Sequence, residues 1–389
     1  MVNIKRKAEN FLKRNDCILW LFTIVAAIYS LLLISSLQRA GDYNYMFTQV
    51  IAVVLGFAGA IIISFIDYNI FIKRWWIFAI IALILAALVF LFGIQVEGTD
   101  DTAWIRLPGG ITVQPSEFIK ICFIFTFTKH LSYIQEKGLI KKFPAVMSLI
   151  IHALIPILVI HLQGDDGTVL IFAFIFLVMT FAAGVPAGYY IALGLLLITG
   201  APIIWNFVLN SEHRSRILAL FDLDGNALTN YGWQQYQGKV SIASGELSGS
   251  GLYNGSRVEY GIVPEQQNDF IFTVAGEELG FIGCVLILAV LFVIILRVII
   301  NGKNTNDIKG KYICYGIFAL ISSQTIINIG MVLGFVPVVG ITLPFFSAGG
   351  SSVLSMLICV GIVQSVVKYN ESEPDKIKVK IGKKDRIKI

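Results

Sequence analysis

The sequence predicts an all-α polytopic membrane protein. Of its 389 residues, 56% are hydrophobic and only 14% are charged, and the mean hydropathy is +0.78. One soluble core cannot bury that much apolar surface. Apolar runs of about 20 residues recur along the chain, which is the length of a membrane-spanning helix, whereas barrel strands are shorter and alternate in polarity.

Ten such runs define a membrane domain over residues 17–367, between an N-terminal segment, 1–16, and a basic tail, 368–389. The first run is too long for a cleaved signal peptide and lacks a small-residue cleavage site, so we expect it to remain as a span. The predicted spans cover residues 17–37, 46–66, 76–96, 115–135, 144–162, 167–183, 188–208, 270–296, 312–333 and 345–367.

The distribution of lysine and arginine predicts that both termini are cytoplasmic. In that orientation 23 of the 30 basic residues lie on the inner side, six lie in outer loops, and Lys120 lies within a span. Such an excess of positive charge inside is the usual pattern of membrane proteins. The net charge of +5 follows from this topology and implies no nucleic-acid partner. We expect a solvated tail, with contact to anionic headgroups as the alternative.

The longest outer loop, residues 209–268, lies between spans seven and eight, and loops of that length are usually functional or disordered. Residues 211–225 alternate charged and apolar side chains, which predicts a short helix on the outer membrane face. Residues 231–261 contain seven glycines. That density is typical of a backbone that bends closely around a ligand, and of a flexible loop.

The fourth span has a polar entry. Gln114 can cap the helix, Pro115 is suited to its first position, and Glu117 is favoured at the positive helix end. Lys120 is costly in an apolar span unless it is paired or faces a polar cavity. Glu117 and Lys120 lie three residues apart on one helix face, so the alternatives are an internal ion pair and a ligand-binding role.

Further acids lie at the outer ends of other spans. Asp165 and Asp166 occupy the turn between spans five and six, where a solvated turn is expected. Glu277 lies deeper and shares a helix face with Asp269 and Thr273, so it could line a cavity. Asp269 stands where the eighth span begins, and both a structural N-cap and a catalytic acid are consistent with that position.

Cysteines and histidines give no sign of a metal or redox site. The five cysteines show no CxxC spacing and lie in or beside apolar runs, which predicts packing roles. The four histidines show no ligand spacing. The sequence contains no P-loop, HExxH or GxSxG motif, so it offers no local support for nucleotide-driven pumping or hydrolase chemistry.

Four segments occur in a recognisable order: WIRLPGGITVQPSEFIK (104–120), LQGDDGTVL (162–170), VPEQQNDFIFTVAGEELGFIG (263–283) and GITLPFFSAGGSSVLSM (340–356). Together with ten spans and the long fourth outer loop, they resemble the SEDS family (shape, elongation, division and sporulation) over nearly the whole chain. The departures from the family pattern are local and remove no presumed reactive group; they are Gly164, Asp166, Gln267, Asn268, Thr342 and Ala348.

The resemblance implies a peptidoglycan glycosyltransferase that polymerises lipid II at the outer face of the bacterial cytoplasmic membrane, usually beside a class B penicillin-binding protein. Asp269 matches the family's essential acid and would act as general base. The cations Arg106, Lys120 and Arg257 are candidates to hold the diphosphate. The remaining substrate-binding candidates are Gln114, Glu117, Asp165, Glu277, Ser351 and Ser352. Mg²⁺ or Mn²⁺ could share the work of the cations, although the sequence shows no dedicated metal cage.

Two other classes of function remain open at this stage. A lipid II flippase or other transporter would also need acids within spans, and Glu277 could then belong to a proton path. A noncatalytic scaffold of a division or elongation complex would not need charged residues at the outer mouths of its spans. Division, elongation and sporulation proteins share these motifs, so the motifs do not distinguish the cellular roles.

Overall fold

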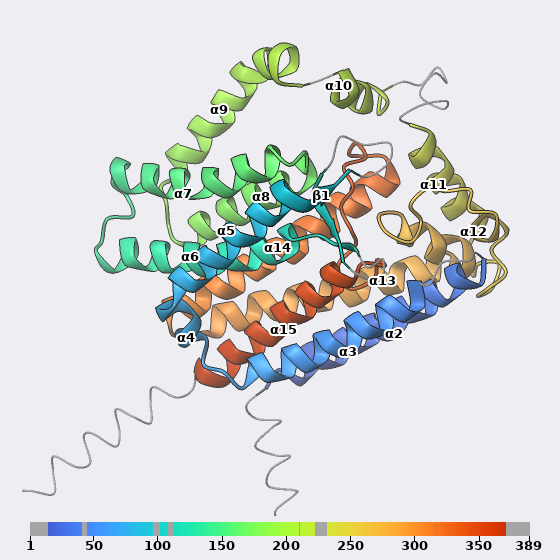
Figure 1. Cartoon of the computed structure of the whole chain (residues 1–389), viewed down its shortest axis with the longest axis horizontal. Helices are drawn as coiled ribbons and strands as arrows, with labels where there is room; N and C mark the ends of the chain where they lie inside the picture. Colours follow the sequence, from blue (N-terminus) through green and yellow to red (C-terminus); the bar gives the residue numbers. More distant parts are fainter. Residues whose placement is uncertain are drawn as a thin grey trace, which may run out of the picture.

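The computed structural model describes residues 15–40, 45–95, 102–107, 112–209, 211–221 and 232–370. The predictions for the basic tail beyond residue 370 and for most of the N-terminal segment lie outside the described residues. Within them the chain forms one bundle of helices, with a small sheet and a helical outer loop at one end (Figure 1).

Each of the ten predicted spans contains a helix. Eight of the described helices are long and apolar enough to cross a membrane. The other two are α8, which has only 17 residues, and α6, which carries Glu117 and Lys120. The ten helices are α2 (Cys17–Ala40), α3 (Tyr45–Ser64), α5 (Trp75–Phe92), α6 (Ser116–Glu136), α7 (Phe143–His161), α8 (Asp166–Ala182), α9 (Ala187–Ile203), α13 (Ile271–Asn304), α14 (Ile308–Leu333) and α15 (Gly350–Asn370). A six-residue helix, α4 (Tyr68–Lys73), connects α3 to α5.

The third and tenth predicted spans extend beyond their helices into non-helical backbone. The third ends at Phe92, because the chain continues into a three-stranded antiparallel sheet of β1 (Gly93–Ile94), β2 (Trp104–Arg106) and β3 (Thr112–Val113). The tenth begins at Gly350 instead of residue 345. Phe345 has a φ of 69°, in the left-handed region that a right-handed helix does not allow. Hydropathy alone does not register either change of backbone direction.

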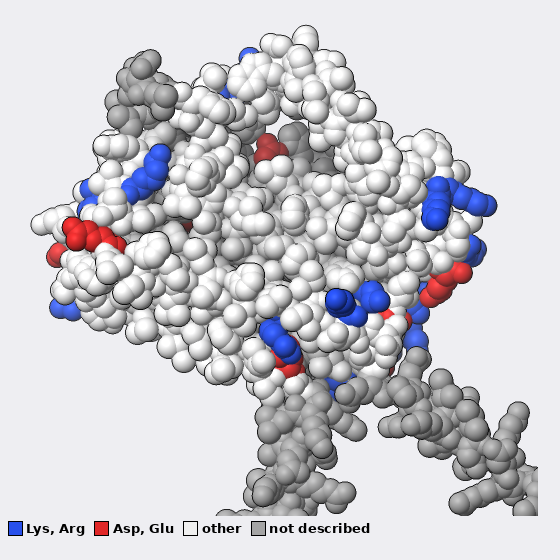
Figure 2. All heavy atoms as spheres, turned by 180° about the vertical axis from the view of Figure 1, so that it is seen from behind, with Lys and Arg blue, Asp and Glu red and all other residues white. Residues whose placement is uncertain are grey.

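The core lies where α6, α13, α14 and α15 meet, and α15 runs along α3. Gly361 allows this approach, since a Cβ there would lie 2.5 Å from the Ala60 carbonyl oxygen. Helix α9 lies at the periphery, none of its residues is buried, and it continues into a π-helical turn, η1 (Ile204–Val208) (Figure 1). Figure 2 shows a mostly uncharged surface on which charged residues form small, separate groups, several of them at its left and right edges, as expected for a membrane protein.

About half of the long outer loop is helical where it is described. Helix α10 (Ser211–Leu218) agrees with the predicted short helix. Over residues 231–261 about half of the backbone is helical, in α11 (Trp233–Ser244) and α12 (Ser256–Glu259). The rest bends at Gly249, Gly251 and Gly261, which have positive φ, as the glycine density predicted.

The glycines of this loop serve its close packing on α13. A Cβ at Gly245 would lie 1.9 Å from the Gly276 carbonyl oxygen, and one at Gly249 would lie 2.1 Å from the Glu278 carbonyl oxygen. Helix α13 is kinked at Gly280, where φ is 65° and ψ is −161°. Such kinks have identifiable local causes, and here glycine supplies the conformation that other residues avoid.

The kink exchanges helical hydrogen bonds for bonds to the loop. The backbone amides of Ser250 and Gly251 donate to the carbonyls of Glu277 (3.0 Å) and Glu278 (2.9 Å). In return the amide of Phe281 donates to the Glu246 carbonyl (2.9 Å). Since backbone groups freed inside a membrane protein must find partners, this exchange holds the loop firmly on the first half of α13.

This packing predicts that Gly245→Ala lowers stability by about 1 to 3 kcal/mol, because its methyl group would overlap the α13 backbone. The measurement is the melting temperature of the purified protein in detergent. Gly188→Ala is the control, since a Cβ at Gly188 meets nothing within 4 Å. Equal melting temperatures for the two variants would contradict the packing role.

Candidate functional site

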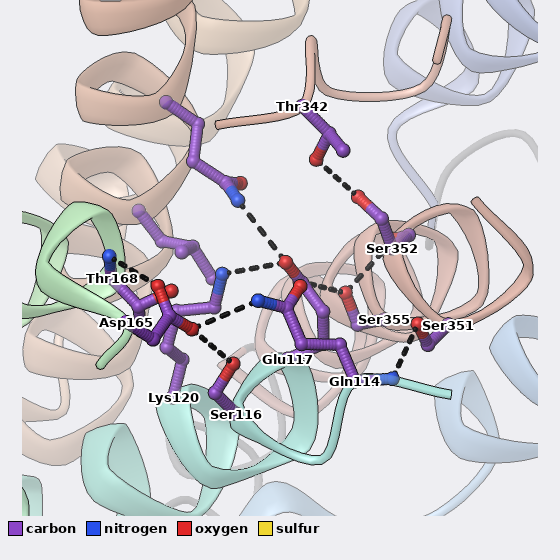
Figure 3. Close-up of polar contacts among 12 residues, drawn as sticks. Gln114, Ser116, Glu117, Lys120, Asp165, Thr168, Thr342, Ser351, Ser352 and Ser355 are labelled. Carbon is purple, nitrogen blue, oxygen red and sulfur yellow. Dashed lines mark hydrogen bonds and ion pairs between the residues drawn. The ribbon is translucent and has the colours of Figure 1, made fainter. Parts of the chain in front are cut away.

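A buried polar network gathers at the N-terminus of α6. Gln114 Nε2 donates to Asp165 Oδ2 (2.8 Å), and the Ser116 hydroxyl donates to the same oxygen (3.2 Å). The Thr168 amide donates to Asp165 Oδ1 (3.0 Å), so Asp165 caps α8 (Figure 3). The prediction that Gln114 caps α6 is wrong, because its side chain binds Asp165 and Pro115 occupies the N-cap position.

Asp165 is only 8% exposed, so the prediction of a solvated turn is wrong at this residue. Asp166 is half-buried and accepts from His161 on one oxygen (2.5 Å). Burial raises the pKa of the Asp165 carboxyl, because desolvation disfavours its charged form; the bonds from Thr168 and Ser116 and the charge of Lys120 act in the opposite direction.

Glu117 and Lys120 form the centre of this network. Lys120 Nζ lies 2.8 Å from Glu117 Oε1, and Lys120 is fully buried. The same Glu117 oxygen accepts from Gln324 of α14 (3.4 Å), and the other accepts from the Ser355 hydroxyl of α15 (2.9 Å). The internal ion pair, one of the two alternatives for Lys120, is therefore present in this structure, and it links three helices (Figure 3).

Helix α15 brings two of the predicted serines to the network. The Gln114 amide donates to the Ser351 hydroxyl (3.2 Å), and the hydroxyls of Ser352 and Thr342 share a hydrogen bond (2.9 Å). Helices α6, α8 and α15 all begin at this network. Helix N-termini carry partial positive charge, so three of them around one region favour a bound anion.

Asp269 lies in a turn immediately before α13 whose backbone is held from two sides. Its carbonyl accepts from Asn328 Nδ2 of α14 (2.8 Å), the Asn268 carbonyl accepts from the Ser347 hydroxyl, and the Gln267 carbonyl accepts from the Ala348 amide (2.7 Å). Three successive carbonyls are thus fixed, which positions a half-buried carboxylate on a rigid support.

The Asp269 carboxylate faces the loop before α15. Its Oδ2 lies 3.6 Å from where a Cβ would stand on Gly340. Asn328 also donates to the Ile341 carbonyl (2.6 Å), and Thr342 follows directly. The segment 340–352 therefore connects the support of Asp269 to the buried network through Ser352. The N-cap interpretation of Asp269 is wrong, since Phe270 occupies that position.

Arg257 and Glu277 form a separate cluster that fastens the loop. The Arg257 amide donates to Glu277 Oε1 (2.7 Å), and its guanidinium donates to Ser241 (2.8 Å) and Gln237 of α11. The prediction that Glu277 shares a helix face with Asp269 is wrong, because α13 begins only at Ile271. Glu277 Oε2 is buried without a hydrogen-bond partner.

Arg106 lies apart from these clusters, exposed at the end of β2. Gln324 and Asn328 were not among the predicted site residues; both are buried and lie four residues apart on one face of α14. Polar residues with helical spacing inside an apolar span were the available signal. The packing role expected for the cysteines agrees with the burial of Cys122, Cys284, Cys314 and Cys359.

The described residues contain no group of three or more His, Cys, Asp or Glu side chains arranged to hold a metal ion. Glu117 and Asp165 are the carboxylates of the buried network, and both are already engaged by several donors. These side chains do not fit a resident Mg²⁺ or Mn²⁺, which prefers oxygen ligands in open octahedral geometry.

The buried ion pair predicts a specific pattern of stability. Lys120→Met leaves the Glu117 carboxylate buried without its counter-charge, which typically costs about 3 to 5 kcal/mol. Adding Glu117→Gln removes that charge, so the double variant should recover part of the lost melting temperature. An additive loss in the double variant would contradict the pairing.

Comparison with known sequences shows close relatives across the whole chain. It is 30% identical over 374 residues to the probable peptidoglycan glycosyltransferase FtsW of Trichlorobacter lovleyi, covering 94% of this chain and 96% of that protein. It is 31% identical to stage V sporulation protein E of Bacillus subtilis, covering 91% of this chain and 97% of that protein.

The fold is similar to that of a chain in a solved structure of a peptidoglycan synthase complex that coordinates polymerization and crosslinking. That chain superposes with a TM-score of 0.77 at 23% identity, covering 92% of this chain and 99% of that one. The sequence profile of the FtsW, RodA and SpoVE family, described as cell cycle protein, matches residues 14–372. The ten helices, the helical outer loop and this match together place the chain in the FtsW/RodA/SpoVE family of multi-pass membrane proteins.

Proposed function

We propose that the chain is a peptidoglycan glycosyltransferase that polymerises lipid II at the outer face of the bacterial cytoplasmic membrane, with Asp269 as general base. The observation that carries the proposal is the rigid mounting of Asp269 beside a region where three helix N-termini converge. A fixed base next to an anion-binding region is what this transfer requires. The glycosyltransferase name of the FtsW relative supports the same activity.

The reaction joins two lipid-linked saccharides. A hydroxyl of the acceptor sugar attacks the anomeric carbon of the donor, and the new carbon–oxygen bond replaces the bond to the diphosphate. Asp269 takes the hydroxyl proton, and undecaprenyl diphosphate leaves with the bonding electrons. A single displacement inverts the anomeric configuration, so an α-linked donor gives a β-linked product.

The diphosphate needs cations and backbone dipoles. Arg106 is exposed and free to approach phosphate oxygens with its planar fork of donors. Lys120 is held by Glu117, but Gln324 and Ser355 also donate to that carboxylate. The arriving diphosphate can therefore replace Glu117 as the partner of Lys120 while Glu117 keeps two donors. Ser351 and Ser352 add hydroxyl groups at the start of α15.

The other loop residues have a positioning role in this proposal. The Arg257 guanidinium donates hydrogen bonds to Ser241 and Gln237 of α11, and Glu277 accepts from the Arg257 backbone amide, so together they keep the loop on α13. Because the carboxylates of the buried network do not fit a resident divalent cation, no step depends on one. Apolar grooves between spans would accept the isoprenoid tails.

We further propose that a class B penicillin-binding protein works beside this chain and crosslinks the strands. The support is the similar chain in the synthase complex that coordinates polymerization and crosslinking. Assays of the purified chain with and without such a partner would show whether the partner activates the polymerase.

The base role predicts that Asp269→Asn and Asp269→Ala lower polymerisation by about 10² to 10⁴, the usual contribution of a positioned general base. The assay follows glycan strands made from labelled lipid II by purified protein in detergent, where transport across a membrane is not required. Glu259→Gln, an exposed change on α12 in the same loop, is the control and should retain activity.

Wild-type turnover in either Asp269 variant would remove this acid from the mechanism. Failure of the wild-type chain to form polymer, with and without a partner, would favour the flippase or scaffold alternatives instead.

The diphosphate role predicts that Arg106→Ala lowers the rate roughly 10- to 100-fold with little change in melting temperature, because one charge-assisted hydrogen bond is lost at an exposed position. Arg74→Ala removes the same charge from an exposed position at the opposite end of the bundle and serves as the control. An equal loss of activity in both variants would indicate a general charge effect.

A further inference from the structure

A second concave surface lies at the opposite end of the bundle from Asp269. It is a groove of about 860 Å³ formed by the end of α8, the start of α9, the end of α13 and the start of α14. Its walls are apolar and include Leu177, Phe181, Leu193, Leu197 and Phe318. Ligand pockets in proteins typically measure about 300 to 1,000 Å³. The α8–α9 groove, as we name it, faces the side that the basic residues predict to be cytoplasmic.

The polar end of the α8–α9 groove is formed by Lys311 and Tyr315, which lie four residues apart on one face of α14. Within the described residues neither the Lys311 ammonium nor the Tyr315 hydroxyl makes a hydrogen bond or an ion pair. Lys309, two residues earlier, differs because its ammonium lies 3.4 Å from a Glu136 oxygen. The groove therefore ends in a partly buried cation and a phenol donor, both available to a ligand.

Helix α9 provides the second reason to expect an occupant. None of its residues is buried, and it extends away from the bundle above α8 (Figure 1). Gly194 faces the α8–α9 groove, and a Cβ added there would meet nothing within 4 Å. Tyr190 of α9 contacts α8 here, because its hydroxyl donates to Thr180 (3.1 Å) and its ring packs against Phe181. Around Gly194 the groove is open, and an apolar chain would cover that part of α9.

We propose that the α8–α9 groove binds an anionic glycerophospholipid of the inner leaflet. Its phosphate contacts the Lys311 ammonium and the Tyr315 hydroxyl, and an acyl chain lies along the apolar walls between α8 and α9. Lysine acts on phosphate as a point charge, and basic groups near the inner leaflet attract anionic lipids. A single lysine matches one phosphate, whereas the diphosphate candidates Arg106 and Lys120 belong to the outer end.

The bound lipid adds packing contacts to α9 beyond those of Tyr190 with α8. It should therefore stabilise the folded chain by binding only to the native state. This site is independent of glycosyl transfer, because it shares no residue with the Asp269 turn or with the network around Glu117. Loss of lipid binding and loss of polymerase activity can be measured separately.

The test compares lipids on the purified full chain in detergent, by native mass spectrometry and by melting temperature. Phosphatidylglycerol should bind more tightly than phosphatidylcholine and raise the melting temperature further. Lys311→Gln should weaken phosphatidylglycerol binding roughly fivefold and remove the difference between the two lipids. Lys309→Gln removes the same charge two residues away, and it should keep the difference. Equal binding of the two lipids by the wild-type chain, or an unchanged preference in Lys311→Gln, would overturn the proposal.

A second pair of variants tests the apolar part of the groove. Gly194→Trp places a large side chain in the α8–α9 groove and should displace phosphatidylglycerol. Gly200→Trp lies further along α9, also meets open space, and should not displace it. Equal lipid retention by both variants, or tighter binding of undecaprenyl phosphate than of phosphatidylglycerol, would show that the groove has another occupant.

Discussion

The burial of an ion pair inside an apolar bundle is the constraint around which the outer half of this protein is arranged. A charged Lys120 with no access to water requires a counter-charge, and Glu117 supplies it from the preceding helical turn. Glu117 in turn needs donors for its remaining lone pairs, which come from Gln324 and Ser355. Satisfying one charged pair therefore fixes how α6, α14 and α15 pack against each other.

A related requirement, that buried backbone groups find hydrogen-bond partners, explains the outer loop. The break at Gly280 frees backbone groups in the first half of α13, and the loop between α11 and α12 takes up their hydrogen bonds. Glycines permit that approach because any side chain would overlap the α13 backbone. The loop therefore forms a rigid wall beside the site, and the turn that carries Asp269 is held by α14 and by the segment before α15.

Rigidity is unevenly distributed between the two ends. The outer end combines a fixed carboxylate, a buried polar network and converging helix N-termini, all of which favour catalysis on an anionic substrate. The inner end contains a helix with no buried residue and a groove whose cation and phenol make no hydrogen bond or ion pair within the described part of the chain. We propose that a membrane phospholipid occupies that groove, whereas the outer end binds the lipid-linked substrate.

The sequence by itself determined the class of the protein, the position of ten helices, the short helix at the start of the outer loop and the location of Asp269 before the eighth span. The length of an apolar run and the order of motifs are properties of the sequence, so they can be recognised before it is known which helices pack together. Tertiary structure alone decided that Gln114 binds Asp165 instead of capping α6, that Asp165 is buried, and that glycines pack the loop onto α13. It also decided that Gln324 and Asn328 support the site. These features depend on which helices become neighbours, and hydrogen bonds between distant segments form only after that arrangement exists.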